Sequence, residues 1–253
     1  RLMASLLDKI CHITHINGSS MRSLILATLI AASPSAAWAN HCATRPNLEA
    51  LVAPWNKADK IFLDGRTDIT YYFEMKPRSY QVVYGDYTGK ITNLSPVEEI
   101  RSDPFYPDER KLGIELIKAT DRLIALDFHE VNSPKDADLV IIGYCNKNDH
   151  KEGAITQNKD GTQYFMILNG CGAIATGAMS PIWLFTHEFG HALGLEHPFD
   201  GADGDCLFDD RPRSAEAAHA GQTVMAYKPS PGGPPHFFTE YDIWVLRKIW
   251  GSE

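Results

Sequence analysis

The chain has 253 residues, of which 44% are hydrophobic and 22% charged, and its formal net charge at pH 7 is −8. A chain of this length and composition can bury a substantial core. The net charge is negative and the Lys and Arg residues form no cluster, so the composition excludes nucleic acids and anionic membranes as expected partners.

The N-terminal part has the order of features found in secretory signals. A charged start at Met21 and Arg22 is followed by an apolar run over 23–32 and by a small-x-small cleavage site that ends at Ala39. This order predicts a signal peptide over 21–39, cleaved after Ala39. The apolar run is too short to span a bilayer, so we expect no membrane anchor after cleavage. The predicted location is secreted or periplasmic.

The rest of the chain reads as an α/β domain over 67–253. We expect 1–20 to be an upstream, non-native segment and 40–66 to be an N-terminal arm that lies on the domain. Runs of aromatic and β-branched residues predict strands, and apolar residues at helical spacing predict helices. Strands are expected at 69–73, 81–84 (alone or in a hairpin), 128–131, 138–143 and 164–169, and helices at 107–126, 181–193 and 239–250. Their order predicts α/β layers with a mixed sheet.

Three of these elements carry further expectations. The run 138–143 is continuously apolar, which is typical of a strand that is covered on both faces. The strand 164–169 is either a core strand or the sheet edge along which an extended peptide binds. In the last helix, the Thr239 hydroxyl and the Asp242 carboxylate are suited to cap the N-terminus.

Four cysteines follow the predicted signal peptide. An even number in an oxidising compartment predicts two disulfides among Cys42, Cys145, Cys171 and Cys206. Three pairings are open. We favour Cys145–Cys171, because both residues follow predicted neighbouring strands, and this leaves Cys42–Cys206.

The strongest chemical signal lies between His187 and Pro198. His187 and His191 are four residues apart, so a helix presents both imidazoles on one face. Gly194 can take positive φ and end the helix, and the turn then brings His197 round as a third nitrogen ligand. Three protein ligands with one open position are typical of a catalytic zinc site.

Glu188 follows the first histidine directly. At that place its carboxylate can take a proton from a water at the metal without binding the metal itself. The sequence therefore predicts a zinc hydrolase in which Glu188 is the general base.

The pattern HExxHxxGxxH, with Thr223-Val224-Met225-Ala226-Tyr227 downstream, resembles the metzincin zinc metallopeptidases and their Met-turn. Pro198, directly after the third histidine, makes the chain most similar to the serralysin and matrixin-type members. The resemblance implies a zincin-like fold. That fold has a twisted mixed sheet with an antiparallel edge strand, an active-site helix, and a small C-terminal subdomain that ends in a helix. It also implies a zinc endopeptidase acting on peptides or proteins, which we expect to be a monomer.

The resemblance assigns roles to two residues of the turn. Met225 would form a structural floor under the zinc site without binding the metal. Tyr227 would be a movable fifth ligand that stabilises the oxyanion during turnover; the alternative is a buried structural tyrosine.

The chain also departs from the resembled families. It has no calcium-binding repeats after the catalytic region and no cysteine switch before it. An acidic loop could offer oxygen ligands to Ca²⁺ but matches no complete EF-hand spacing, so a solvated loop is favoured; it contains Asp200, Asp203, Asp205, Asp209 and Asp210. The scattered histidines are read as ordinary surface or hydrogen-bonded residues, namely His129, His150, His219 and His236.

Two other functions stay open beside the general endopeptidase. One is a non-catalytic zincin-fold binding protein, against which the presence of Glu188 speaks. The other is a narrow-specificity peptidase that acts on one partner protein.

Overall fold

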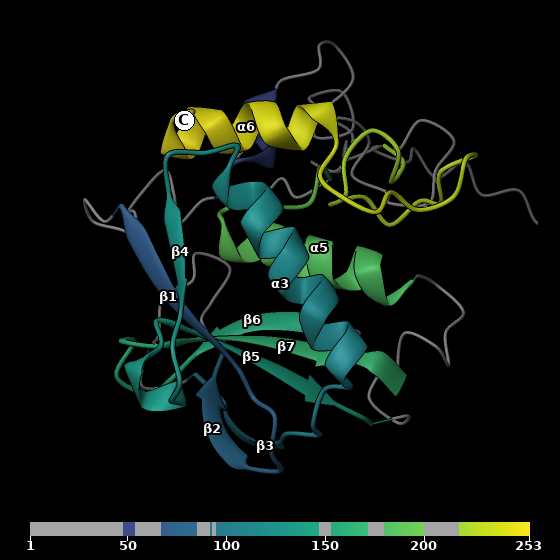
Figure 1. Cartoon of the computed structure of the whole chain (residues 1–253). Helices are drawn as coiled ribbons and strands as arrows, with labels where there is room; N and C mark the ends of the chain where they lie inside the picture. The colour runs from purple at the N-terminus through teal and green to yellow at the C-terminus, as the bar shows by residue number, and fades with distance from the viewer. Residues whose placement is uncertain are drawn as a thin grey trace, which may run out of the picture. The chain divides into compact units, whose positions relative to one another are not determined.

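The fold is built on one mixed β-sheet (Figure 1). The computed structural model of the chain describes residues 48–53, 67–84, 92, 95–146, 153–171, 180–199 and 218–253. Within them the strands are β1 (Asp68–Phe73), β2 (Ser79–Val83), β3 (Val97–Arg101), β4 (Asp127–Glu130), β5 (Leu139–Tyr144), β6 (Gly153–Gln157) and β7 (Tyr164–Asn169). The helices are α3 (Pro107–Asp121), α5 (Pro181–Ala192) and α6 (Glu240–Trp250), with short 3₁₀ helices η1 (Leu48–Leu51) and η2 (Pro134–Asp136).

The described part of the sheet has seven strands in the order β3-β2-β6-β7-β5-β1-β4. Strands β4, β1, β5 and β7 are parallel to one another, and β6 is antiparallel to β7. The β2–β3 hairpin continues beyond β6, and β3 is an antiparallel edge strand. The predicted mixed α/β architecture with an antiparallel edge strand is confirmed.

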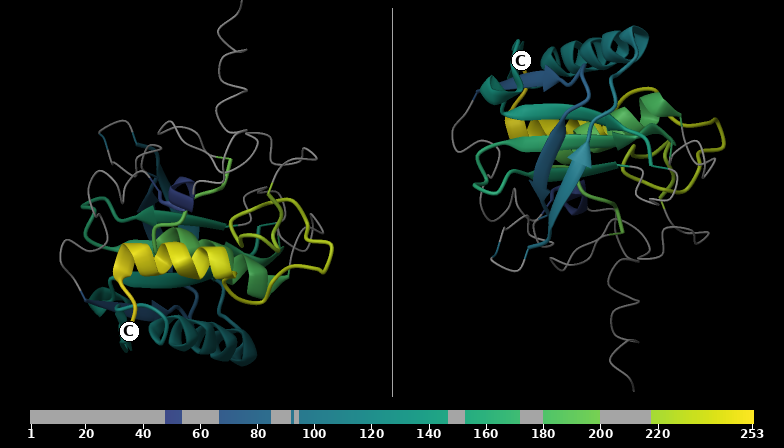
Figure 2. Two further views of the ribbon diagram at one scale, coloured as in Figure 1. Left: turned by 90° about the horizontal axis from the view of Figure 1, so that it is seen from above. Right: turned by 90° about the horizontal axis from the view of Figure 1, so that it is seen from below.

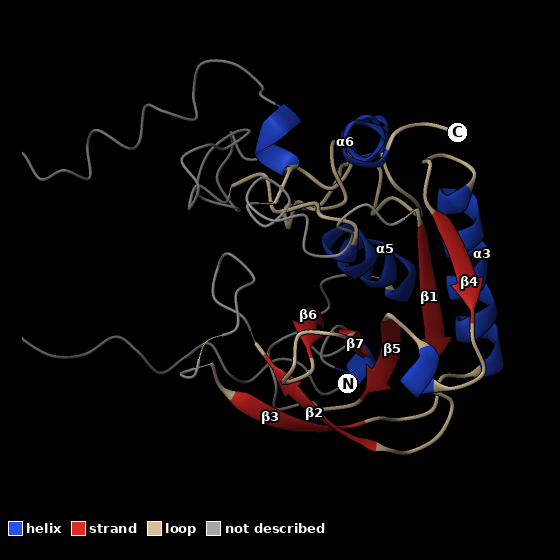
Figure 3. Ribbon diagram, turned by 90° about the vertical axis from the view of Figure 1, so that its left-hand side faces the viewer, coloured by secondary structure: helices blue, strands red, loops and turns tan. Residues whose placement is uncertain are grey.

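Each face of the sheet has its own apolar core. Helices α3, α5 and α6 share one core with β1, β5 and β7. On the opposite face, residues of the β2–β3 hairpin pack against alternate residues of β5 and β7. Figures 2 and 3 show the hairpin crossing the face of the sheet that lies away from α5. Strand β5 is therefore buried on both faces, as its unbroken apolar run predicts.

The structure decides between the two alternatives for 164–169. Strand β7 lies in the interior of the sheet between β5 and β6, and all its residues are buried, so it is the core strand and not the peptide-binding edge. The sequence does not predict β6 or β3, because β6 consists largely of small and polar residues and β3 has a single buried residue, Ile100. Without β6, β7 reads as the last strand.

The predicted helix 107–126 ends early, at Asp121. Leu123 donates its N–H to the Thr120 carbonyl in a closing turn, and Ala125 donates to the Gly251 carbonyl of the C-terminal segment. Ile124 and Leu126 are buried all the same. Tertiary contacts therefore bury these apolar residues in a turn, although their spacing is helical.

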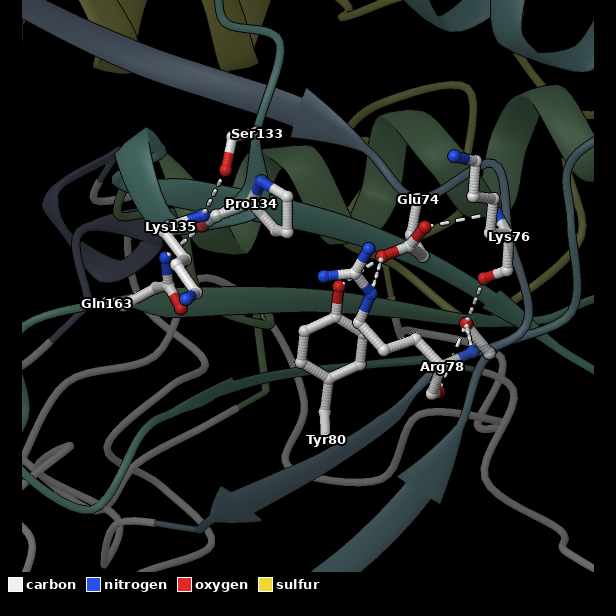
Figure 4. A network of polar contacts seen from close by, with 9 residues as sticks. Glu74, Lys76, Arg78, Tyr80, Ser133, Pro134, Lys135 and Gln163 are labelled. Carbon is white, nitrogen blue, oxygen red and sulfur yellow. Dashed lines mark hydrogen bonds and ion pairs between the residues drawn. The ribbon is translucent and has the colours of Figure 1, made fainter.

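A buried carboxylate anchors the turn from β1 to the hairpin (Figure 4). Glu74 is fully buried and accepts hydrogen bonds from the Tyr80 hydroxyl and from the Lys76 N–H, the latter at 3.0 Å. The Arg78 Nε atom lies 3.1 Å from Glu74 Oε2, the oxygen that also accepts the Tyr80 hydroxyl. Burial, and next the bond to Glu74, raise the pKa of Tyr80. A charged group without partners would be costly at this place, and the three partners hold the hairpin against the sheet.

The preferred disulfide is confirmed, because Cys145 and Cys171 are bonded just after the parallel neighbours β5 and β7. Cys42, Cys206, the predicted signal peptide and most of the predicted arm lie outside the described residues. A search of the described part finds no helix with the length and apolarity needed to cross a membrane.

Gly113 of α3 provides a test of the core. A Cβ atom there would lie 2.6 Å from Phe73 Cζ and 2.9 Å from Phe185 Cε2. Alanine normally stabilises a helix interior by about 1 kcal/mol relative to glycine. Overpacking a core costs about 1–3 kcal/mol. We therefore expect Gly113→Ala to lower the free energy of unfolding by up to about 2 kcal/mol in urea denaturation.

The control is Gly232→Ala, since a Cβ atom at this exposed glycine contacts nothing within 4 Å. Its effect should stay within about 0.5 kcal/mol. Stabilisation by Gly113→Ala would show that the aromatic rings move aside freely.

Candidate metal centre

Helix α5 holds two of the candidate ligands. It begins after Ser180, whose hydroxyl accepts the Trp183 N–H at 3.2 Å, and Pro181 occupies its first turn. Most of the helix is buried, so its orientation is fixed by the core. The ring centroids of His187 and His191 are 4.9 Å apart, as expected for residues four apart on one helical face.

A tight turn brings in the third histidine. Gly194 has φ of 94°, which confirms the predicted left-handed residue after the helix. Beyond it, the Nε2 atoms of His191 and His197 lie 3.2 Å apart. The ligand atoms of His187, His191 and His197 all lie within 4.8 Å of one another, and no other such group occurs among the described residues.

Backbone carbonyls fix the tautomers of two of these rings. His187 Nδ1 lies 2.8 Å from the Val224 carbonyl oxygen, and His191 Nδ1 lies 2.8 Å from that of Leu195. A carbonyl only accepts hydrogen bonds, so each Nδ1 carries the proton and each Nε2 presents a lone pair. This is the arrangement that orients metal-binding histidines in proteins.

Burial also keeps the first histidine neutral. The pKa of His187 is lowered well below its ordinary value, mainly by burial and further by His191 and His197, while the bond to Val224 opposes the shift. The neutral form is the one that binds a metal ion.

One pair of the nitrogens has the separation expected around a small tetrahedral ion. Two Zn–N bonds of about 2.0–2.1 Å at a tetrahedral angle would place the nitrogens about 3.3–3.4 Å apart. The observed separation of His191 Nε2 and His197 Nε2 is 3.2 Å. Three imidazole nitrogens are ligands that zinc prefers in proteins, so the donor set fits Zn²⁺.

Two aromatic rings surround the third histidine. The Tyr227 hydroxyl lies 2.7 Å from His197 Nε2, and Tyr227 as a residue is 43% exposed. Phe199 stacks on His197 with its ring centroid 5.0 Å away and nearly parallel. Tyr227 is therefore a solvent-accessible residue at the metal group, not a buried one. The sequence did not predict the contact between Phe199 and His197. The only sequence signal for it is that Phe199 follows His197 by two residues.

Glu188 of α5 is buried, and its side chain extends toward β6 with the carboxyl group against Gly153. Met225 is fully buried below α5, and a Cβ atom at Gly190 would lie only 2.7 Å from its sulfur. The glycine between the two helical histidines thus lets the methionine approach the helix closely.

The turn that carries Val224 is tied to the C-terminal helix. Asp242 of α6 is buried and accepts the Thr223 hydroxyl at 2.6 Å and the Val224 N–H at 3.0 Å. It also accepts the Thr239 N–H at 2.8 Å, so the predicted capping pair is present. Burial raises the pKa of the Asp242 carboxyl, and these hydrogen bonds oppose that shift. The tie to Thr223 and Val224 was not predicted.

A second tie comes from the N-terminal side. Val52 bridges Leu195, the Ala53 N–H donates to the Gly194 carbonyl at 2.9 Å, and the Glu196 N–H donates to the Leu51 carbonyl at 2.9 Å. The turn that carries His197 is therefore paired with residues 51–53. No sequence pattern indicated this contact.

The remaining candidates are not part of the group. Of the scattered histidines, His129, His219 and His236 are described, and none belongs to the cluster around His187. His150 and the acidic loop of the calcium hypothesis lie outside the described residues.

No protein-family model and no curated protein sequence matches the chain. Among solved structures, it is similar to high choriolytic enzyme 1, a hatching enzyme zinc-protease of the medaka fish Oryzias latipes. The identity is 11% and the TM-score 0.39, over 75% of this chain and 92% of that chain. It is also similar to myroilysin, with 13% identity and a TM-score of 0.42, over 87% of this chain and 96% of that chain. At these values neither likeness carries weight for fold or activity.

Asp242→Asn tests the tie between α6 and the metal group. The amide nitrogen of asparagine is a donor, so it cannot accept from both Thr223 and Val224. We expect the metal affinity to fall about 10–100-fold, as for other residues that orient ligands. The free energy of unfolding should fall by about 2–3 kcal/mol. Chelator competition and urea denaturation measure the two effects.

The matched control is Glu240→Gln, an exposed carboxylate in the first turn of the same helix. It should bind metal like the wild type. Wild-type affinity in Asp242→Asn would mean that His187 is oriented independently of α6.

Proposed function

We propose that the chain is a zinc-dependent endopeptidase of the metzincin type. The observation that supports this best is the convergence of His187, His191 and His197, two of them with their second nitrogens on backbone carbonyls. A zinc ion held there would polarise a scissile carbonyl and lower the pKa of a bound water. Within the class, Pro198 favours the serralysin branch.

Glu188 is the proposed general base. Its side chain is 5% exposed, and it follows the first ligand directly on α5. From there it takes the proton of the attacking water and passes it to the leaving amine. Little water reaches the carboxyl group, and this would strengthen its interaction with a zinc ion held by the three histidines.

Tyr227 is the proposed oxyanion partner. Its hydroxyl contacts His197, yet its ring is half exposed and rests on aromatic neighbours, so it can turn without disturbing the core. A hydroxyl at this point can donate to the oxygen on which negative charge develops.

The substrate is proposed to be an extended peptide. Since β7 is internal, β6 is the strand that supports this idea. Within the described residues it pairs with β2 only through Val83 and Gln157, and its first residue, Gly153, lies beside Glu188. A peptide that adds to β6 would pass the base with its backbone extended.

Secretion as a monomer after cleavage of the signal peptide is part of the proposal, and the disulfide between Cys145 and Cys171 is compatible with an oxidising compartment. The alternatives are a zincin-fold binding protein without catalysis and a peptidase restricted to one partner protein. The buried Glu188 beside the three histidines favours a peptidase, of general or narrow specificity, over a binding protein.

The first test is cleavage of an unfolded protein by the chain from residue 40 onward. We expect a chelator to abolish cleavage and zinc to restore it. Glu188→Gln should lower kcat by about 10²–10⁴-fold, because the amide cannot take the proton. Zinc content should remain one per chain.

Glu115→Gln on α3 serves as the control, since this carboxylate is exposed and lies on another helix. A chain that binds zinc but cleaves nothing would favour the two alternatives. A chain that binds no zinc would refute the proposal altogether.

Tyr227→Phe tests the oxyanion role separately. Loss of one donor to the oxyanion should lower kcat by about 10²–10³-fold with little change in KM or zinc content. Tyr241→Phe, an exposed tyrosine on α6, is the control. Unchanged turnover in Tyr227→Phe would remove the tyrosine from the mechanism.

A further inference from the structure

The side chain of Glu188 occupies the space above Gly153. An ideal Cβ atom at Gly153 would lie 2.3 Å from Glu188 Oε1, 2.4 Å from its Cδ and 2.5 Å from its Cγ. Non-bonded carbon atoms normally approach to about 3.5–4.0 Å. Any residue other than glycine would therefore collide with the carboxyl group as it now lies.

The backbone of Gly153 does not itself require glycine. The residue starts β6 and pairs with Leu168 in the regular antiparallel ladder with β7. It is not among the glycines with positive φ, which are Gly161, Gly194, Gly233 and Gly251. Alanine would fit the backbone, so the missing Cβ atom matters only for space.

We propose that Gly153 is a positioning residue for Glu188. The absent side chain provides the room in which the carboxyl group lies between α5 and β6. This inference rests on the proposed function, in which Glu188 is the general base.

The position of the clash decides which part of the protein would respond. The colliding atoms, Cγ, Cδ and Oε1, belong to the Glu188 side chain, which can rotate, while β6 is held by β7 and α5 by the core. With a Cβ atom present, the carboxyl group would move by about 1 Å or more, to reach normal contact distance. A shift of about 1 Å in a reacting group can lower the rate about 100-fold.

The experiment compares Gly153→Ala with Gly170→Ala. Gly170 follows β7, is exposed, and would place its Cβ atom within 4 Å of nothing. In Gly153→Ala we expect kcat to fall about 100-fold, with KM and zinc content close to those of the wild type. A crystal structure should show the Glu188 carboxyl displaced by about 1 Å. Gly170→Ala should match the wild type in all four readouts.

A double variant separates positioning from other roles of Gly153. In a Glu188→Ala background the space is empty, so Gly153→Ala should cause no further loss of the residual activity. An equal further loss would overturn the proposal, because the glycine would then act on the substrate or the sheet. An unmoved carboxyl group or wild-type kcat in the single variant would also overturn it.

The remaining case is that the Gly153→Ala variant does not fold, so that its activity cannot be measured. If Gly153→Ala alone does not fold, Gly153→Ala with Glu188→Ala should fold with a wild-type Tm, and failure of this pair would overturn the proposal. If the wild type cleaves nothing, the proposed function fails. The crystal structure of Gly153→Ala then still tests the positioning of Glu188.

Discussion

The hydrogen bond between His187 Nδ1 and the Val224 carbonyl joins the helix that carries the first candidate ligand to the turn around Met225. It fixes the proton on one nitrogen of a buried ring and leaves the other nitrogen free to bind an ion. The carbonyl is in turn held by Asp242, which binds the N–H of the same residue from α6. The orientation of the His187 ring thus depends on α6, a helix far along the chain from α5.

The same dependence recurs around the other ligands. The turn before His197 is paired with residues 51–53, and the ring of His197 lies against Phe199 and near Tyr227. Each imidazole is thus in contact with backbone carbonyls or aromatic rings that fix its orientation. Such supporting contacts let a site keep its donors in place at little entropic cost when an ion binds.

Sequence patterns succeeded where one local rule governed the outcome. Strands β1, β5 and β7, the start of α3 at Pro107 and the cap at Thr239 follow from runs, periodicity and capping chemistry. Patterns failed where burial came from distant partners. Apolar residues at helical spacing continue past Asp121, but there they lie in a turn that is bonded to the C-terminal segment. Strand β6 has too few apolar residues to be recognised from the sequence. Because β6 cannot be recognised, the sequence leaves open whether β7 is an edge strand or a core strand.

The sequence by itself determined which donors can meet. Two histidines four residues apart share a helical face, and a glycine of positive φ can turn the chain toward the third, because both effects act within a few residues. Only the tertiary structure decided which ring nitrogen is free, how Val224 and Asp242 support it, and that Glu188 lies over Gly153. These contacts join segments far apart in the chain, and their distances are set by how the sheet, α5 and α6 pack.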